Sequence, residues 1–188
     1  MDTTDTRQLI MNAARSRVQA HGYNALSFRE LAKEVGIKSA SIHYHFPTKG
    51  DLGAELARRY TEDASAYLKG LLAASEDLQT RIKAYTDVFR AALLNDNRMC
   101  LYGIMAAEHD DLPAEVRAEV DKFVEVNIRW LTGVLGARKS GSGKKSLPRQ
   151  ALAVFAAIEG AQLIARGRGD VAVYDEAIAA YRTAGLLP

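Results

Sequence analysis

Apolar side chains recur at steps of three and four residues through almost the whole of this 188-residue chain. That spacing places them on one face of an α-helix, whereas a half-buried strand alternates apolar and polar residues. The first such run stops before Gly22, a typical helix terminator, and consists of Leu9, Ile10, Ala13, Ala14 and Val18. No strand-like alternation and no internal repeat competes with this pattern, so it predicts an all-α protein.

Two short helices separated by a tight turn are expected next. Ser27 and Glu30 have the spacing of a capping box, which predicts a helix that begins after Ser27, and Gly36 should end it. A third helix fits the segment from Ser39 to His45. The order helix, glycine-containing turn, helix is that of a helix-turn-helix, in which the second helix enters the major groove of DNA.

The spacing within the third helix predicts which of its faces meets DNA. Ile42 and Phe46 lie one turn apart and should pack inward, which leaves Ala40 and Tyr44 outermost, with Ser41 and His43 at the flanks. The small side chains at the start of this helix permit close approach. His43 and Tyr44 can reach base edges or phosphates.

Longer helices follow. Thr48 and Asp51 form a second capping box and open a fourth helix that should end near Ala73. Lys49 lies in its first turn, where it can meet a phosphate or simply remain solvated. Helical spacing then continues over residues 78–92, a short segment 99–108, 113–134, 148–166 and 170–184, with a glycine- and serine-rich loop at 138–146.

The helix expected at 148–166 is apolar on more than one side, which indicates burial against its own domain and against a second surface. The residues that carry this breadth are Leu152, Phe155, Ile158 and Leu163, and Gly160 would allow another helix to approach closely. A monomer would have to expose this surface, so a homodimer is expected.

Composition narrows the class of protein. Hydrophobic residues make up 48% and charged residues 26%, which is ordinary for a globular protein. Residues 1–50 carry a net charge of +3 and the remainder −1, which suits phosphate contact by the N-terminal part.

No apolar run is long enough to cross a bilayer, and Met1–Arg7 is too polar for a signal peptide, so a cytoplasmic protein without a membrane partner is expected. Cys100 is the only cysteine, which excludes an internal disulfide and a cysteine-based zinc site.

The segment from Phe28 to Leu52, which reads FRELAKEVGIKSASIHYHFPTKGDL, closely resembles the N-terminal domain of the TetR family of transcriptional regulators. The resemblance is specific over about residues 7–56 and concerns only the helical layout beyond them. It implies a DNA-binding domain at 1–50 and a helical ligand-binding and dimerisation domain at 51–188. It also implies a homodimer built on the last two helices, and a repressor released from a palindromic operator by a small-molecule inducer.

The resemblance also implies roles for individual residues. Arg29 would touch DNA from the second helix, Ser39, Ala40, Ser41 and His43 would face bases or nearby phosphates, and Tyr44, His45 and Lys49 would anchor the backbone. For His45, packing into the core is an equal alternative. The full set of expected DNA-contacting residues is Ser27, Arg29, Ser39, Ala40, Ser41, His43, Tyr44, His45 and Lys49.

Candidates for the inducer site come from polar and aromatic residues in the second domain. Asn127 interrupts an apolar stripe, and a buried polar group without a partner costs roughly 1 to 3 kcal/mol. It should therefore bond either a neighbouring helix or the ligand. The residues that could line a cavity are Tyr85, Phe89, Cys100, Tyr102, Met105, Phe123, Asn127 and Trp130.

Two functions are alternatives to ligand-induced repression. Cys100 could sense oxidants or electrophiles, although a buried cysteine usually serves only as an unreactive core side chain. An enzyme is disfavoured because no nucleophile motif, phosphate-binding glycine loop or metal-ligand spacing is present. The acidic run around His109 is expected to be solvated, so neither a metal nor a cofactor is predicted.

Overall fold

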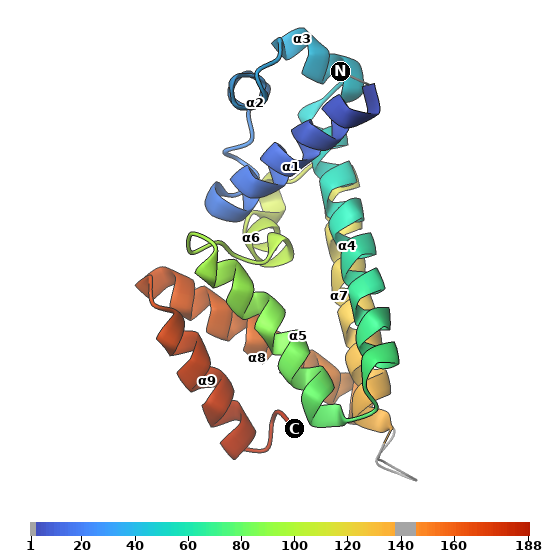
Figure 1. Ribbon diagram of the computed structural model, residues 1–188, viewed down its shortest axis with the longest axis vertical. Coiled ribbons are helices and arrows are strands. Elements are labelled where there is room, and N and C mark those ends of the chain that lie inside the picture. The colour runs from blue at the N-terminus through green and yellow to red at the C-terminus, as the bar shows by residue number, and fades with distance from the viewer. Residues whose placement is uncertain (1–2, 138–145) are drawn as a thin grey trace. The chain divides into compact units, whose positions relative to one another are not determined.

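The computed structural model describes residues 3–137 and 146–188 (Figure 1). Its described residues form nine α-helices, one short 3-10 turn and no strand, which confirms the all-α class. The helices are α1 (Thr3–His21), α2 (Phe28–Val35), α3 (Ser39–His45), α4 (Lys49–Ala74), α5 (Leu78–Leu94), α6 (Leu101–Ala107), α7 (Ala114–Gly136), α8 (Leu147–Arg168) and α9 (Val171–Thr183), and the 3-10 turn η1 (His109–Asp111) follows α6. The loop expected at 138–146 lies outside the described residues, apart from Ser146.

Packing divides the chain into two compact units. The N-terminal unit comprises residues 1–61 and 101–123, and the C-terminal unit comprises residues 62–100 and 124–188. The chain therefore passes between the units three times, inside α4, between Cys100 and Leu101, and inside α7. These units are defined by packing, so the functional boundary expected after residue 50 stays a prediction. No helix among the described residues has the length and apolarity needed to cross a membrane.

The two predicted capping boxes have different outcomes. At the start of α4 the Thr48 backbone N–H donates to Asp51 Oδ2 (2.9 Å) and the Asp51 N–H donates to Thr48 Oγ1 (3.0 Å), as a capping box requires. Ser27 precedes α2 as predicted, but its side chain makes no cap hydrogen bond. The Glu30 carboxylate accepts from Lys33 Nζ at 3.0 Å. The capping box was therefore wrong at α2.

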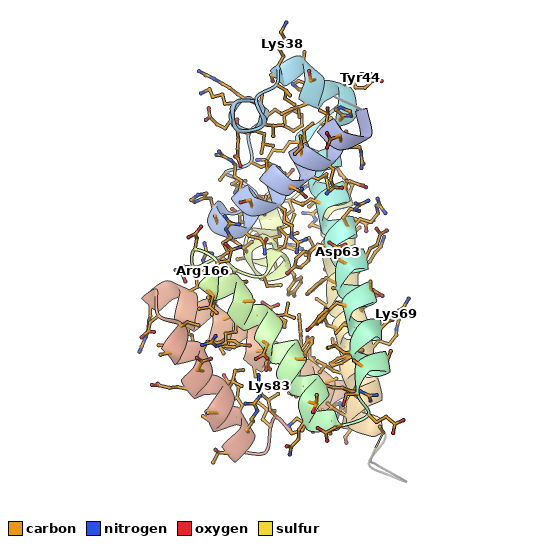
Figure 2. All side chains as sticks on the ribbon, in the orientation of Figure 1. Lys38, Tyr44, Asp63, Lys69, Lys83 and Arg166 are labelled. Atoms are coloured by element: carbon orange, nitrogen blue, oxygen red, sulfur yellow. The ribbon has the colours of Figure 1, made fainter. Side chains whose placement is uncertain are left out.

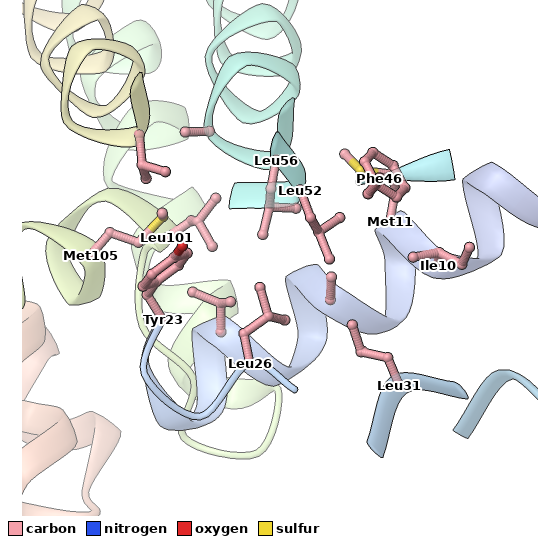
Figure 3. Packing of buried hydrophobic residues seen from close by; sticks show 14 of the residues in the cluster. Ile10, Met11, Tyr23, Leu26, Leu31, Phe46, Leu52, Leu56, Leu101 and Met105 are labelled. Carbon is pink, nitrogen blue, oxygen red and sulfur yellow. The ribbon is translucent and has the colours of Figure 1, made fainter. Parts of the chain in front are cut away.

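The core of the N-terminal unit joins the first four helices to α6 and the start of α7 (Figure 3). Phe46 and Leu52 meet the apolar face of α1, and Leu101 and Met105 of α6 belong to the same buried cluster. Three short helices alone would bury too little surface to be stable, because small domains leave a large share of their apolar area exposed. Residues 101–120 supply the missing part of this core.

The turn after α1 is held by a carboxylate from the far part of the unit. Gly22 has φ +87°, and the next residue, Tyr23, donates its backbone N–H to Glu108 Oε2. The side chain of Asn24 donates to Asp111 Oδ2 at 2.8 Å. The expectation that the acidic run beside His109 is merely solvated is therefore wrong for Glu108 and Asp111, which fasten the end of α6 to the start of the helix-turn-helix.

A Cβ atom at residue 22 would lie 2.5 Å from Glu108 Oε1 and would sit on backbone with positive φ. We predict that Gly22→Ala lowers the free energy of unfolding by about 2 to 4 kcal/mol, because it combines left-handed strain with displacement of Glu108. Urea denaturation at fixed protein concentration measures the loss. The matched control is Gly36→Ala, where φ is +74° but a Cβ meets no atom within 4 Å. The control should lose only about 1 kcal/mol, and equal losses would show that the Glu108 contact adds nothing.

The C-terminal unit is built on α5, α8 and α9, which pack against one another, together with the later parts of α4 and α7. Its buried polar side chains are bonded across helices. Tyr174 Oη donates to the Thr86 carbonyl (2.8 Å), Trp130 Nε1 donates to the Leu68 carbonyl (3.0 Å), and Gln162 bridges two further segments. Such bonds offset the cost of burying polar atoms and fix the helices in register.

Candidate functional site

The turn between α2 and α3 has the geometry that the sequence predicts. Gly36 ends α2 in the left-handed conformation (φ 74°, ψ 32°), and the next N–H, of Ile37, donates to the Ala32 carbonyl at 2.9 Å. This pair of features is the usual glycine-based helix stop. Lys38 is extended and α3 begins at Ser39, so the second helix of the motif starts immediately after the turn.

The face of α3 that points away from the core is the one deduced from spacing. Ile42 and Phe46 are 0% and 2% exposed, whereas the Tyr44 side chain is 78% exposed (Figure 2). Tyr44 is the largest side chain that α3 presents to solvent. Of the other predicted DNA contacts, Ser39, Ala40, His43 and Arg29 are exposed, and Ser27, Ser41, His45 and Lys49 are half-buried.

Two rings on α3 are held in place by neighbours. The His43 ring lies edge-on to Phe28 with centroids 4.8 Å apart, and its Nδ1 is 3.2 Å from the Pro47 carbonyl. That contact requires the proton on Nδ1, which leaves Nε2 of the neutral ring as an acceptor. The rings of Tyr44 and His45 meet edge to face at 5.2 Å. His43 and Tyr44 are therefore oriented before any ligand arrives.

The Lys49 side chain is more restrained than that of a fully solvated lysine at the start of a helix. Its Nζ donates to the Asn24 carbonyl at 3.3 Å and lies 4.5 Å from the centre of the Tyr23 ring. Partial burial lowers the pKa of Lys49, and the nearby Glu108 carboxylate opposes that change. Burial and the Glu115 charge together raise the pKa of Tyr23 to about 12. Lys49 thus joins α4 to the same loop that Glu108 holds.

Lys38 was missed by the sequence reasoning. It precedes α3, is exposed, and extends away from the helix-turn-helix (Figure 2). Within the described part of the chain it forms no ion pair. Its position directly before the first turn of the predicted recognition helix was the signal that could have identified it.

The expected inducer-site residues fall into two groups. Tyr102, Met105 and Phe123 belong to the N-terminal unit, where the Phe123 ring stacks on those of Tyr102 (5.5 Å) and Tyr60 (5.2 Å). With Met105 they line a hollow of only about 10 Å³, which is smaller than a water molecule needs. The other residues, which belong to the C-terminal unit, are Tyr85, Phe89, Cys100, Asn127 and Trp130.

Four of the members in the C-terminal unit contact one another through Tyr85. Asn127 is 2% exposed and its Oδ1 accepts from Tyr85 Oη at 2.8 Å, so the open alternative of a bond to a neighbouring helix is realised. The Tyr85 ring stacks on Trp130 at 5.0 Å and meets Phe89 edge-on at 5.4 Å. Cys100 is a buried free thiol whose backbone N–H donates to Gln162 Oε1 at 2.9 Å. Whether this cluster contacts a ligand stays a prediction.

Glu159 of α8 is a buried acid that the sequence reasoning did not select. Both carboxylate oxygens are buried and lack a hydrogen-bond partner of normal geometry among the described residues. Burial raises the pKa of Glu159 to about 7, and the neighbouring Cys100 thiol opposes part of that rise. Burial raises the pKa of the Tyr174 phenol, and the charges of Asp87 and Glu159 raise it further.

This acid should make stability depend on pH. The pKa of Glu159 is higher in the folded chain than in the unfolded one, so the folded state binds the extra proton between pH 4.5 and 7. The stabilisation that comes from this protonated carboxyl is complete below that window and is lost as pH rises through it. We predict that Glu159→Gln raises the free energy of unfolding at pH 8 by about 1 to 3 kcal/mol and changes it little at pH 4.5. Urea titrations at both pH values test this, and a gain that is equal at both would contradict the assignment.

Metal ligation finds no support in the part of the chain that the structure describes. No three His, Cys, Asp or Glu side chains gather there as a metal site would require. The acidic residues near His109 instead serve the loop contacts described above.

Comparisons with known proteins agree on one family. Residues 10–56 match the family model described as bacterial regulatory proteins, tetR family. A TetR transcriptional regulator from Legionella pneumophila is 33% identical, with a TM-score of 0.84 over 90% of this chain and 91% of that one. A TetR-family regulator from Agrobacterium tumefaciens is 29% identical, with a TM-score of 0.84 over 92% and 93% of the two chains. The HTH-type nicotine-responsive transcriptional repressor HdnoR of Paenarthrobacter nicotinovorans is 26% identical over 131 residues, which is 66% of this chain and 68% of that protein.

Proposed function

The chain belongs to the TetR family of transcriptional regulators, and we propose that it is a homodimeric repressor which leaves a palindromic operator when a small molecule binds. The observation that carries the DNA-binding part is the outward face of α3, where Tyr44 is 78% exposed while Ile42 and Phe46 are buried. The similarity to a repressor named as nicotine-responsive supports release by a small organic molecule. Oxidant sensing is not favoured, since Cys100 is only 3% exposed.

In this proposal α3 is the recognition helix. His43 and Tyr44 reach base edges or phosphates, and the small side chains of Ser39, Ala40 and Ser41 let the start of the helix approach the groove. Arg29, Ser27, His45 and Lys49 contact the backbone from the flanks, and Lys38 is added to that set because of its exposure. Phosphate contacts fix the position of the protein, whereas base contacts select the sequence.

Lys38 and Lys49 provide a test of the phosphate contacts. We predict that Lys38→Ala and Lys49→Ala each weaken binding to all DNA sequences alike and reduce the slope of log K against log salt by about one unit. Only Lys49→Ala should also lower stability, because Lys49 holds the Asn24 carbonyl. Fluorescence anisotropy with labelled operator at several salt concentrations gives the slopes. Lys69→Ala, an exposed lysine of the C-terminal unit, is the control and should leave the slope unchanged.

The proposed dimer uses the outer face of α8. Leu152, Leu163 and Ile164 are 50%, 55% and 54% exposed, and with Gly160 they lie along one side of the helix. A Cβ at Gly160 would meet no atom within 4 Å, which leaves room for a partner helix. Pairing α8 and α9 with their symmetry mates would cover this stripe, and burial of apolar area favours association.

Burial corrects the residues that the sequence assigned to this interface. Phe155 and Ile158 are 3% and 0% exposed and pack inside the subunit, as does the nearby Ala161, which is 1% exposed. A charge at any of them would therefore disrupt the fold of the subunit rather than the dimer alone.

Ile164→Glu is the change that separates folding from dimerisation. We predict a folded monomer that has lost most of its operator affinity, because a single helix-turn-helix contacts only one half-site. Analytical ultracentrifugation and circular dichroism report the two properties. Val88→Glu on α5, at a side chain that is 42% exposed, should leave both the dimer and DNA binding intact. A dimeric Ile164→Glu variant with normal affinity would place the interface elsewhere.

Release of DNA is proposed to pass through α4, whose residues 49–61 belong to the N-terminal unit and 62–74 to the C-terminal unit. A coupling of roughly 1 to 3 kcal/mol between the ligand and DNA sites would suffice for substantial release.

The deciding experiment selects bound DNA from a random pool and then adds candidate compounds. A palindrome with half-sites about one helical turn apart, displaced by a compound that binds the protein, is the expected result. A selected sequence without two-fold symmetry would overturn the proposal.

A further inference from the structure

A groove of about 490 Å³ lies within the C-terminal unit, between α4, α7 and the first turn of α5. Its volume falls in the range of roughly 300 to 1,000 Å³ that is typical of small-molecule sites. None of the eight residues expected to bind an inducer lines it except Trp130.

The floor of the groove is apolar and rigid. Leu68, Trp130 and Val134 are buried beneath it, with exposures of 4%, 8% and 2%. The indole N–H of Trp130 already donates to the Leu68 carbonyl, and Tyr85 stacks on the ring. The groove therefore offers an apolar surface that is held in one position, and Leu72, which is 44% exposed, extends it toward solvent.

The rim of the groove carries only positive charge. Lys69 of α4, Arg81 of α5 and Arg129 of α7 line it, and no aspartate or glutamate is among the described residues that do. Arg81 donates to the carbonyls of Ser75 and Leu72, so its charge is not neutralised by these contacts. Lys69 and Arg129 are exposed and form no ion pair with any described residue, and Lys69 extends outward from α4 (Figure 2).

We propose that this groove binds an amphiphilic organic anion, a carboxylate with an extended apolar part, as the effector of the regulator. The apolar part would cover Leu68 and Trp130, and the carboxylate would meet Arg129 and Lys69, because guanidinium and ammonium groups are the natural partners of a carboxylate. An organic cation would be repelled by three like charges, and a neutral molecule would leave them without a counter-charge. The assignment of effector rests on the repressor function proposed above.

The chain supplies its own reporter, since Trp130 is its only tryptophan. Decanoate, kept below its micelle concentration, should produce a saturable change in tryptophan fluorescence. Decanol and decyltrimethylammonium, which share the apolar part, should bind more weakly. Reversal of an exposed charge in Arg129→Glu should weaken decanoate binding by about tenfold and leave decanol binding unchanged. Equal binding of all three compounds would overturn the choice of an anion.

Two glycines provide a matched pair that tests the location. Gly133 lines the groove and Gly70 does not, both are exposed on helices, and a Cβ at either meets no atom within 4 Å. Gly133→Leu should block decanoate, whereas Gly70→Leu should bind it as the parent does, and each should gain helix stability alike. Circular dichroism verifies that both variants fold. Decanoate binding that survives in Gly133→Leu would overturn the groove as the site.

Operator binding separates this proposal from the function on which it rests. Decanoate that binds the groove and releases DNA supports both. Decanoate that binds without changing operator affinity overturns its role as effector, while selection of a palindromic operator would still support the repressor. Failure to select any DNA, with decanoate still bound and blocked by Gly133→Leu, would overturn the repressor and leave the groove as a carboxylate site.

Discussion

The apolar cluster of the N-terminal unit is the interaction that holds α3, the proposed recognition helix, in place. The helices α1 to α3 hold Ile42 and Phe46 in place only because Leu52, Leu101 and other side chains of α4, α6 and α7 complete the core around them. A helix-turn-helix of fewer than fifty residues buries too little area to fix its own geometry. The orientation of the α3 face that carries Tyr44 therefore depends on core contacts with α6 and α7, which lie more than fifty residues later in the chain.

The same dependence explains why polar contacts cluster at the turn after α1. Glu108 accepts from the backbone of Tyr23, and Lys49 donates to Asn24 while it lies over the Tyr23 ring. One short loop is thus bonded to the end of α6 and to the start of α4. This loop leads directly into the helix-turn-helix.

In the C-terminal unit the buried polar groups divide into satisfied and unsatisfied ones. Asn127, Gln162 and Tyr174 each bond across to another helix, and such bonds fix helices in one register. Glu159 lacks a comparable partner among the described residues, so it is held as a protonated acid over part of the neutral range.

The sequence by itself determined the helical class, the helix bounds to within a few residues and the face of α3 that points outward. These follow from local rules, since apolar spacing and glycine stops act over a few residues. It could not determine that Glu108 fastens the loop after α1, that Phe155 and Ile158 belong to the core, or that Lys69, Arg81 and Arg129 gather around one groove. Each of these joins residues distant along the chain, and only the packing of helices decides which distant side chains meet.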